Sequence, residues 1–226
     1  MEFLDIIKNR RSVRSFIDKP LEKSIIYTII DTARFAPSAG NLQNWEFIVI
    51  EGQEKKNKIA RMCLNQIWMA TAPYIIIVCA KTEKCRKYYG EYGDKYALEN
   101  GVFAASHIVL AAQEFNVNGI FVGAFDEYGL KELLVIPHDV IVVGVIPLGY
   151  SVEKPNMPLR YELKSLINFN KWGNKVTDFK YEVLGETSHH VERIAKNAKS
   201  SAIENSKSLF EYVKSKFIKK DKTTQN

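Results

Sequence analysis

The sequence predicts an α+β fold in which a central sheet, mixed or antiparallel, lies between layers of helices. Short apolar runs typical of buried strands are interspersed with helical patterns, but without the regular alternation of a parallel βαβ sheet. One expected helix, 94–115, carries apolar residues around nearly its whole circumference, as a helix covered on both sides does. With 226 residues, of which 46% are hydrophobic and 26% charged, the chain can bury a full-sized core.

The individual elements follow from hydrophobic periodicity along the chain. A short helix at 3–9 precedes a second helix at 21–34, in which Ile25, Ile26 and Ile29 share one face. Expected strands cover residues 45–50, 74–80, 118–122 and 140–148. Further expected helices cover residues 53–64, 94–115 and 127–134.

A basic extension at 175–226 follows a predicted domain at 1–174. Apolar residues recur at three- and four-residue steps over 188–218, which predicts an amphipathic helix, and 219–226 is expected to be disordered. Of the net charge of +6, the extension carries +4, so the nearly neutral body is not expected to bind nucleic acid. The helix packs on the body or a partner subunit, or it contacts a membrane or another protein; the sequence leaves these alternatives open.

Two motifs near the N-terminus point to a ligand with a phosphate and a flat ring. Arg10, Arg11, Ser12 and Arg14 place three guanidinium groups and a hydroxyl within five residues, and arginine forks match phosphate oxygens. The later loop at 36–41 offers small side chains and close backbone approach. Each motif alone has a plain structural explanation, as a solvated helix end and as a turn. Together, in this order, they favour a mononucleotide cofactor.

These motifs resemble those of the nitroreductase family of flavin enzymes, as do blocks at 119–127, 143–150 and 170–172, so that the resemblance covers about residues 1–174. It implies a layered α+β fold built as an intertwined homodimer, with two sites for tightly, non-covalently bound FMN at the interface. It also implies a ping-pong transfer of electrons from NADH or NADPH to a small acceptor such as a nitroaromatic, quinone or enone. The nicotinamide would bind transiently, since the chain has no GxGxxG fingerprint.

The resemblance also assigns roles to residues. Arg10, Ser12 and Arg14 would hold the FMN phosphate, with Arg11 beside them, and Arg160 would close over it, although its neighbours are less basic than in relatives. Gly123 and Ala124 match the segment whose backbone N–H faces flavin N5. Residues assigned to the isoalloxazine ring and ribityl chain are Pro37, Ser38, Ala39, Gly40, Asn41 and Gln43. Whether Asn65 or Gln66 also touches the ring stays open.

No catalytic side chain and no metal site are predicted, because flavin carries the redox chemistry itself. Substrate-pocket walls are expected from loops at 62–72 and 84–94. The tyrosines in and just after the second loop either stack on a flat substrate or pack as surface structure: Tyr88, Tyr89, Tyr92 and Tyr96. Alternative functions are a flavin-binding adaptor whose tail recruits a partner or membrane, and a specialised reaction such as dehalogenation or flavin breakdown.

A cytoplasmic location is expected. Cys63, Cys79 and Cys85 have no metal-ligand spacing and are expected to be reduced thiols. The first five residues include two acidic side chains, whereas a secretory signal peptide would begin with basic ones. The longest apolar run, 141–148, is too short to span a bilayer.

Overall fold

The computed structural model describes residues 2–175, so the predicted helix at 188–218 and the predicted disorder at 219–226 lie outside the described residues. The chain divides into two compact units, Met1–Met157 and Pro158–Asn226. The first unit holds the sheet and the candidate site. In the second unit, a short helix, α7 (Leu163–Leu166), lies among the described residues.

The sheet has four antiparallel strands in the order β1-β2-β4-β3. The predicted strands are confirmed at β1 (Trp45–Ile50), β2 (Tyr74–Lys81) and β4 (Val140–Gly149). The strand expected at 118–122 is wrong in length, because β3 covers only Asn118–Gly119 and is followed by a bridge from Val122 to Val145.

The interruption after β3 has a local cause. The pairing of Gly119 with Leu148 and of Val122 with Val145 keeps one register, so the strand is broken rather than shifted. Between these pairs the Phe121 ring covers Gly144, and a Cβ at Gly144 would collide with that ring. Because Gly144 in β4 has no side chain, the Phe121 ring can lie on it, and the β3–β4 pairing is interrupted at this point.

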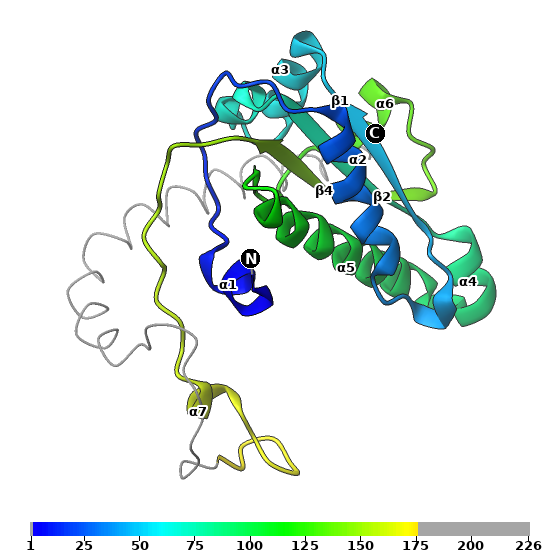
Figure 1. Ribbon diagram of the computed structural model, residues 1–226. Coiled ribbons are helices and arrows are strands. Elements are labelled where there is room, and N and C mark those ends of the chain that lie inside the picture. The colour runs from blue at the N-terminus through cyan, green and yellow to red at the C-terminus, as the bar shows by residue number, and fades with distance from the viewer. Residues whose placement is uncertain (1, 176–226) are drawn as a thin grey trace, which may run out of the picture. The chain divides into compact units, whose positions relative to one another are not determined.

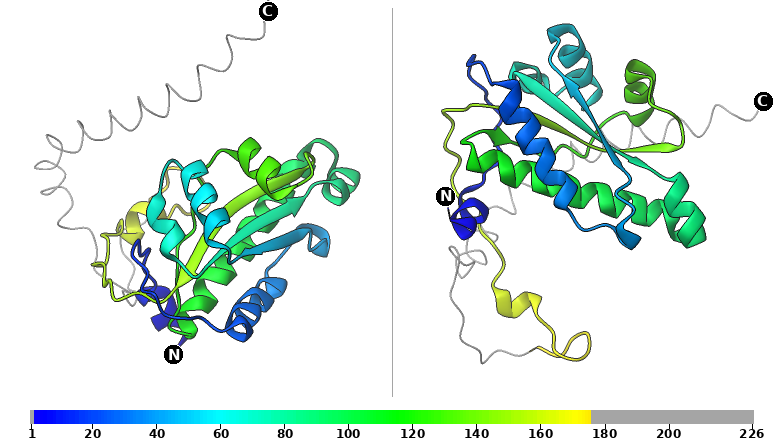
Figure 2. Two further views of the ribbon diagram at one scale, coloured as in Figure 1. Left: turned by 90° about the horizontal axis from the view of Figure 1, so that it is seen from above. Right: turned by 45° about the vertical axis from the view of Figure 1, so that its right-hand side comes forward.

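Helices cover both faces of the sheet (Figures 1 and 2). One face packs against α2 (Lys23–Thr32) and α5 (Gly93–Glu114), while α3 (Gln53–Met62) and α6 (Glu127–Leu134) lie over the other. Alternate residues of β2 enter the two cores, which explains why its sequence is apolar without interruption.

The long helix α5 is buried along one face only within the single chain. Ala104 and Ile108 are fully buried, and Gly101 lets the helix approach Val143, whose Cγ2 would lie 2.5 Å from a Cβ there. On the opposite face Leu98, Val102 and Phe103 are 42–48% exposed. That a partner subunit covers this second face therefore stays a prediction.

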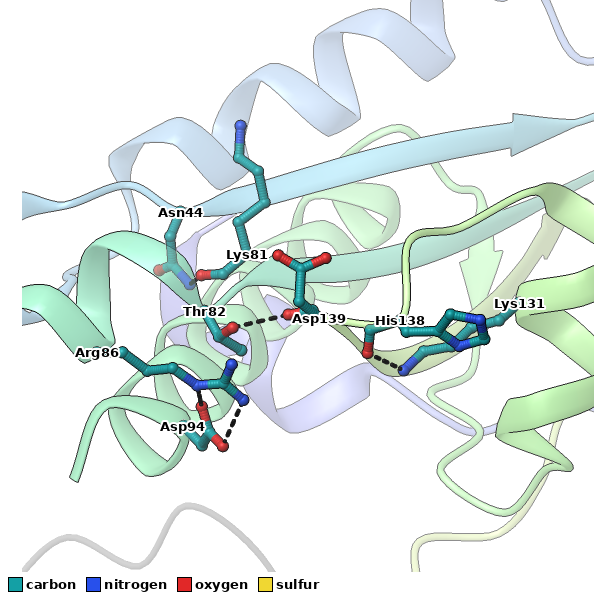
Figure 3. Close-up of polar contacts among 8 residues, drawn as sticks. All are labelled: Asn44, Lys81, Thr82, Arg86, Asp94, Lys131, His138 and Asp139. Atoms are coloured by element: carbon teal, nitrogen blue, oxygen red, sulfur yellow. Dashed lines mark hydrogen bonds and ion pairs between the residues drawn. The ribbon is translucent and has the colours of Figure 1, made fainter. Parts of the chain in front are cut away.

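The remaining elements are short. They are α1 (Phe3–Asn9), α4 (Glu83–Tyr89) and the 3₁₀ helices η1 (Ala33–Phe35), η2 (Ala39–Asn41), η3 (Ile67–Thr71) and η4 (Gly90–Tyr92). The loops expected at 62–72 and 84–94 are thus largely helical, and the helix expected at 21–34 is α2 followed by η1. In the second loop, the Arg86 guanidinium makes two bonds to the Asp94 carboxylate, of 2.6 and 2.9 Å, and ties α4 to α5 (Figure 3).

The three cysteines are buried and free. Burial raises the pKa of Cys63 to about 12 and that of Cys79 to about 11. Within residues 2–175, no cluster of His, Cys, Asp and Glu side chains has the make-up of a metal site. Over the same residues, no helix is long and apolar enough to cross a bilayer.

Candidate functional site

The arginine motif lies on an extended segment between α1 and α2. Val13 and Phe16 anchor this segment by burying their side chains against Ala72 and Trp68, with the Phe16 and Trp68 ring centroids 6.5 Å apart. The Ile17 N–H donates to the Tyr150 carbonyl at 2.9 Å, just past the end of β4. The segment is therefore fixed to one end of the sheet.

The arginines of the motif have different surroundings. Arg11 folds back on α1, where its Nη1 donates to the carbonyls of Lys8 and Arg10 at 2.7 and 2.8 Å. A cation is favoured at this end of a helix, so Arg11 has a structural role. The Arg14 amide donates to Glu153 Oε2 at 2.8 Å, while its exposed guanidinium has no ion-pair partner within residues 2–175.

Arg10 and Ser12 are half-buried on the same segment as Arg14. An unpaired guanidinium, a second arginine and a hydroxyl within five residues suit a phosphate dianion. The residues present therefore fit the phosphate end of FMN, and their contacts to it stay a prediction.

The second motif forms a compact loop, 36–43, directly before β1. The Ser38 hydroxyl accepts from the Gln43 N–H at 3.2 Å, and Gln43 Nε2 donates to Asn41 Oδ1 at 2.9 Å. Gly40, Asn41 and Gln43 have φ of 55°, 55° and 45°. Left-handed conformations of non-glycine residues cost about 1–3 kcal/mol each and persist only where surrounding contacts hold them.

Gly123 and Ala124 lie on an exposed stretch that is held at both ends. Val122 exchanges two hydrogen bonds of 2.9 Å with Val145, and the Asp126 N–H donates to the Met62 carbonyl at 2.9 Å. In the part of the chain that the structure describes, the N–H groups of Gly123 and Ala124 have no hydrogen-bond acceptor. Two exposed, unpaired amides fit the edge of a flat acceptor such as flavin, which remains a predicted role.

The segment 62–66 lies beside this stretch through the Met62–Asp126 bond. Gln66 Nε2 is occupied by the Cys63 carbonyl at 3.0 Å. Asn65 is exposed, with a φ of 58°. Of the two residues that the sequence left open, Asn65 is the more exposed, and contact of either side chain with the ring stays a prediction.

The arginine segment and the loop lie at opposite ends of the sheet. The loop leads into β1 at Asn44, whose carbonyl accepts from the Lys81 N–H. Lys81 in turn pairs with Val140, the first residue of β4, so the loop lies at the end of the sheet where β4 begins. The arginine segment is bonded just past the other end of β4, at Tyr150. The ten residues of β4 span about 30 Å at about 3.4 Å per residue.

A single chain therefore does not bring the two motifs together on one ligand. Residues 62–72 contact both the arginine segment, through Trp68, and the 123–126 stretch, through Met62. These three segments form one half of a candidate site, and the loop 36–43 is the other half.

Three of the four candidate tyrosines pack together next to the loop. The rings of Tyr89 and Tyr96 meet edge to face at 4.9 Å, and Tyr92 lies 6.3 Å from Tyr96. A Cβ on Gly40 would lie 2.6 Å from the Tyr89 hydroxyl oxygen, so the tyrosine reaches the loop itself. The cluster packs as surface structure and also borders the loop half of the candidate site.

Arg160 is exposed and belongs to the second compact unit. Its predicted closure over the phosphate, like the predicted domain boundary near residue 174, stays a prediction.

Comparisons with known proteins agree with this fold. The model of the family described as Nitroreductase family matches residues 7–68 and 60–150. A protein of Methanothermobacter thermautotrophicus, provisionally named NADH dehydrogenase/NAD(P)H nitroreductase, is 30% identical in an alignment 178 residues long that covers 76% of this chain and 88% of the relative. A Bacillus subtilis protein named FMN reductase (NAD(P)H) is 26% identical in an alignment 175 residues long that covers 70% of each chain.

A crystal structure of a nitroreductase family protein from Clostridium novyi NT has 29% sequence identity and a TM-score of 0.63, and the match covers 77% of this chain and 97% of that one. The predicted α+β fold is thereby confirmed. With its helices on both faces of a four-stranded antiparallel sheet and its two N-terminal motifs, the chain belongs to the nitroreductase family.

Proposed function

We propose that this protein is an FMN-dependent oxidoreductase that takes a hydride from NADH or NADPH and passes electrons to a small organic acceptor. Membership of the family supports the class, as do relatives named NAD(P)H nitroreductase and FMN reductase. The single observation that carries the proposal is the pair of complementary half-sites. One offers phosphate-binding side chains and unpaired backbone amides, and the other offers a compact loop of small residues.

When bound, FMN would supply the redox chemistry, the exchange of a hydride and of electrons, for which the chain itself provides no group. The chain binds and orients it. Arg10, Ser12 and Arg14 hold the phosphate through charge-assisted bonds. The Gly123 and Ala124 amides donate to the ring edge, where fixed donors stabilise negative charge. The loop 36–43 lines the ring, and Asn65 is its additional polar neighbour.

Two copies of the chain complete each site, with the arginine segment from one and the loop from the other. The exposed apolar residues of α5, Leu98, Val102 and Phe103, give the second copy a surface to bury. The resulting homodimer has two equivalent sites, as a two-fold axis requires. We place the catalytic domain at residues 1–174, and the enzyme in the cytoplasm because its three buried thiols are free.

One pocket serves both substrates in turn, so the kinetics are ping-pong. The reduced nicotinamide leaves before a nitroaromatic, quinone or enone enters, with Tyr89, Tyr92 and Tyr96 of the loop half beside the ring face. The chemistry of these walls suits flat, conjugated acceptors.

The visible spectrum of the purified protein tests the proposal. A yellow protein whose flavin band bleaches on anaerobic titration with NADH or NADPH, and recovers when a quinone or nitroaromatic is added, supports it. A colourless protein that takes up no FMN on mixing contradicts it. The same titration on a protein lacking residues 175–226 shows whether residues 1–174 suffice for the reaction.

A further inference from the structure

A buried pair of asparagines lies beneath the loop 36–43. Asn44, directly before β1, and Asn100, on α5, are each 2% exposed. Asn100 Nδ2 donates to Asn44 Oδ1 at 2.7 Å, and Asn44 Nδ2 donates to the Lys81 carbonyl at 2.8 Å. Figure 3 shows the Asn44 amide directed at that carbonyl. Buried amides are costly unless bonded, so this pair has one favoured arrangement.

The other end of the Asn100 amide holds the loop. Its Oδ1 accepts from the Ala39 N–H at 2.9 Å, across 61 positions of sequence. The loop is thus anchored at Ala39 by Asn100 and at Asn44 by the same side chain. Between the two anchors lie the residues of positive φ, Gly40, Asn41 and Gln43.

We infer that Asn100 is a positioning residue for FMN binding, which holds the loop 36–43 in its ligand-ready conformation before the cofactor arrives. The inference rests on the proposed function, because the loop's ligand is FMN. The strained loop needs a contact that over-determines it. The Asn100 amide makes both contacts at once, because its oxygen accepts from Ala39 and its nitrogen donates to Asn44. A loop ordered in advance spares the ligand the cost of ordering it.

The experiment compares FMN with riboflavin, which lacks the phosphate, on the apo-protein. In Asn100→Ala the loop loses its anchor, so we expect the affinities for FMN and riboflavin to fall together, each by about tenfold. In Arg14→Ala only the phosphate contact is lost, so FMN affinity falls while riboflavin affinity stays. The ratio of the two dissociation constants, measured by quenching of flavin fluorescence, therefore separates a loop effect from a phosphate effect.

Ile108→Val is the matched control, because Ile108 is fully buried on the same helix about two turns further on. It loses one methylene and lowers the thermal midpoint without touching the loop, and both flavins should bind as to the wild type. Asn100→Ser replaces Asn100→Ala if that variant does not fold. It keeps a hydroxyl in the buried site, but the shorter side chain stops short of the Ala39 N–H, so its two affinities should again fall together.

Flavin affinities in the Asn100 variant that equal those of Ile108→Val overturn the inference, as does a fall for FMN alone. A wild-type protein that binds neither flavin overturns the proposed function itself, and this inference with it. The two failures are therefore distinguishable in one set of titrations.

Discussion

Two defective variants should restore each other when they are mixed, because each site takes its two halves from different chains. The first variant, Arg10→Ala with Arg14→Ala, disables the phosphate half. Each guanidinium contact to a dianion is worth about 1.5–3 kcal/mol, so the pair should weaken FMN binding at least a hundredfold. The second variant, Gly40→Val, disables the loop half.

The damage at Gly40 follows from its geometry. Its φ of 55° is strained for a branched residue, and a Cβ there would lie 2.6 Å from the Tyr89 hydroxyl oxygen. Neither variant alone should retain FMN after gel filtration at a limiting concentration of FMN.

Random pairing of equal amounts of the two chains makes about half of the dimers mixed. In a mixed dimer, one site combines the intact arginine segment of the Gly40→Val chain with the intact loop of the other chain. The second site carries both defects. About a quarter of all sites in the mixture should therefore bind FMN as the wild type does.

The assay is FMN content per chain and NAD(P)H oxidation after the two variants are co-expressed with different affinity tags. Two differently tagged copies of the arginine variant serve as the control, and they should recover nothing. Mixed dimers that form, carry both tags and still hold no FMN would refute the shared site, because the 30 Å separation along β4 would then have no bearing on the binding of the cofactor.

Three further outcomes are expected. Ser12→Ala should weaken FMN binding by about 0.5–1.5 kcal/mol in fluorescence titrations. Arg11→Ala should leave the FMN affinity unchanged and lower only the stability of α1, because Arg11 caps that helix. An equal loss of FMN affinity in the two variants contradicts this assignment of roles. Gly40→Ala should lower the thermal midpoint, and Tyr89→Phe in the same chain should restore part of the loss by removing the hydroxyl contact. Burial raises the pKa of Cys63 to about 12 from 9.0, so the folded state keeps a proton that the unfolded chain loses. Stability should therefore fall as pH rises from about 9 towards 12, and Cys63→Ala should flatten that slope in urea titrations.

Much of the fold could be predicted from local pattern. The continuous apolar runs at β2 and β4 gave their strands within a residue or two, and the 3.6-residue period gave α6 with its observed bounds, Glu127–Leu134. Because the buried face of an element needs apolar residues at regular positions, the hydrophobic periodicity identifies that face even when the packing partner is unknown. The motif residues could also be recognised from the sequence, because arginine and serine bind phosphate and small loop residues let a ligand approach the backbone, whatever their tertiary surroundings.

The break after β3 and the helices in 84–94 were not predictable in this way. The first depends on the Phe121 ring reaching Gly144, and the second on the Arg86–Asp94 pair and the packing of α4 against Gly93. Both depend on which segments meet in space. Propensity over a short window contains no information about such contacts.

Most elements, the two motifs and the family they resemble can be recognised in the sequence alone. That the motifs lie at opposite ends of one sheet, and that the Asn100 amide holds Ala39 from a distant helix, is established only when the chain folds. Long-range pairing between β2 and β4 sets the strand order and the register. That pairing determines which ends of the strands coincide, and so which residues of one chain meet and which need a second copy.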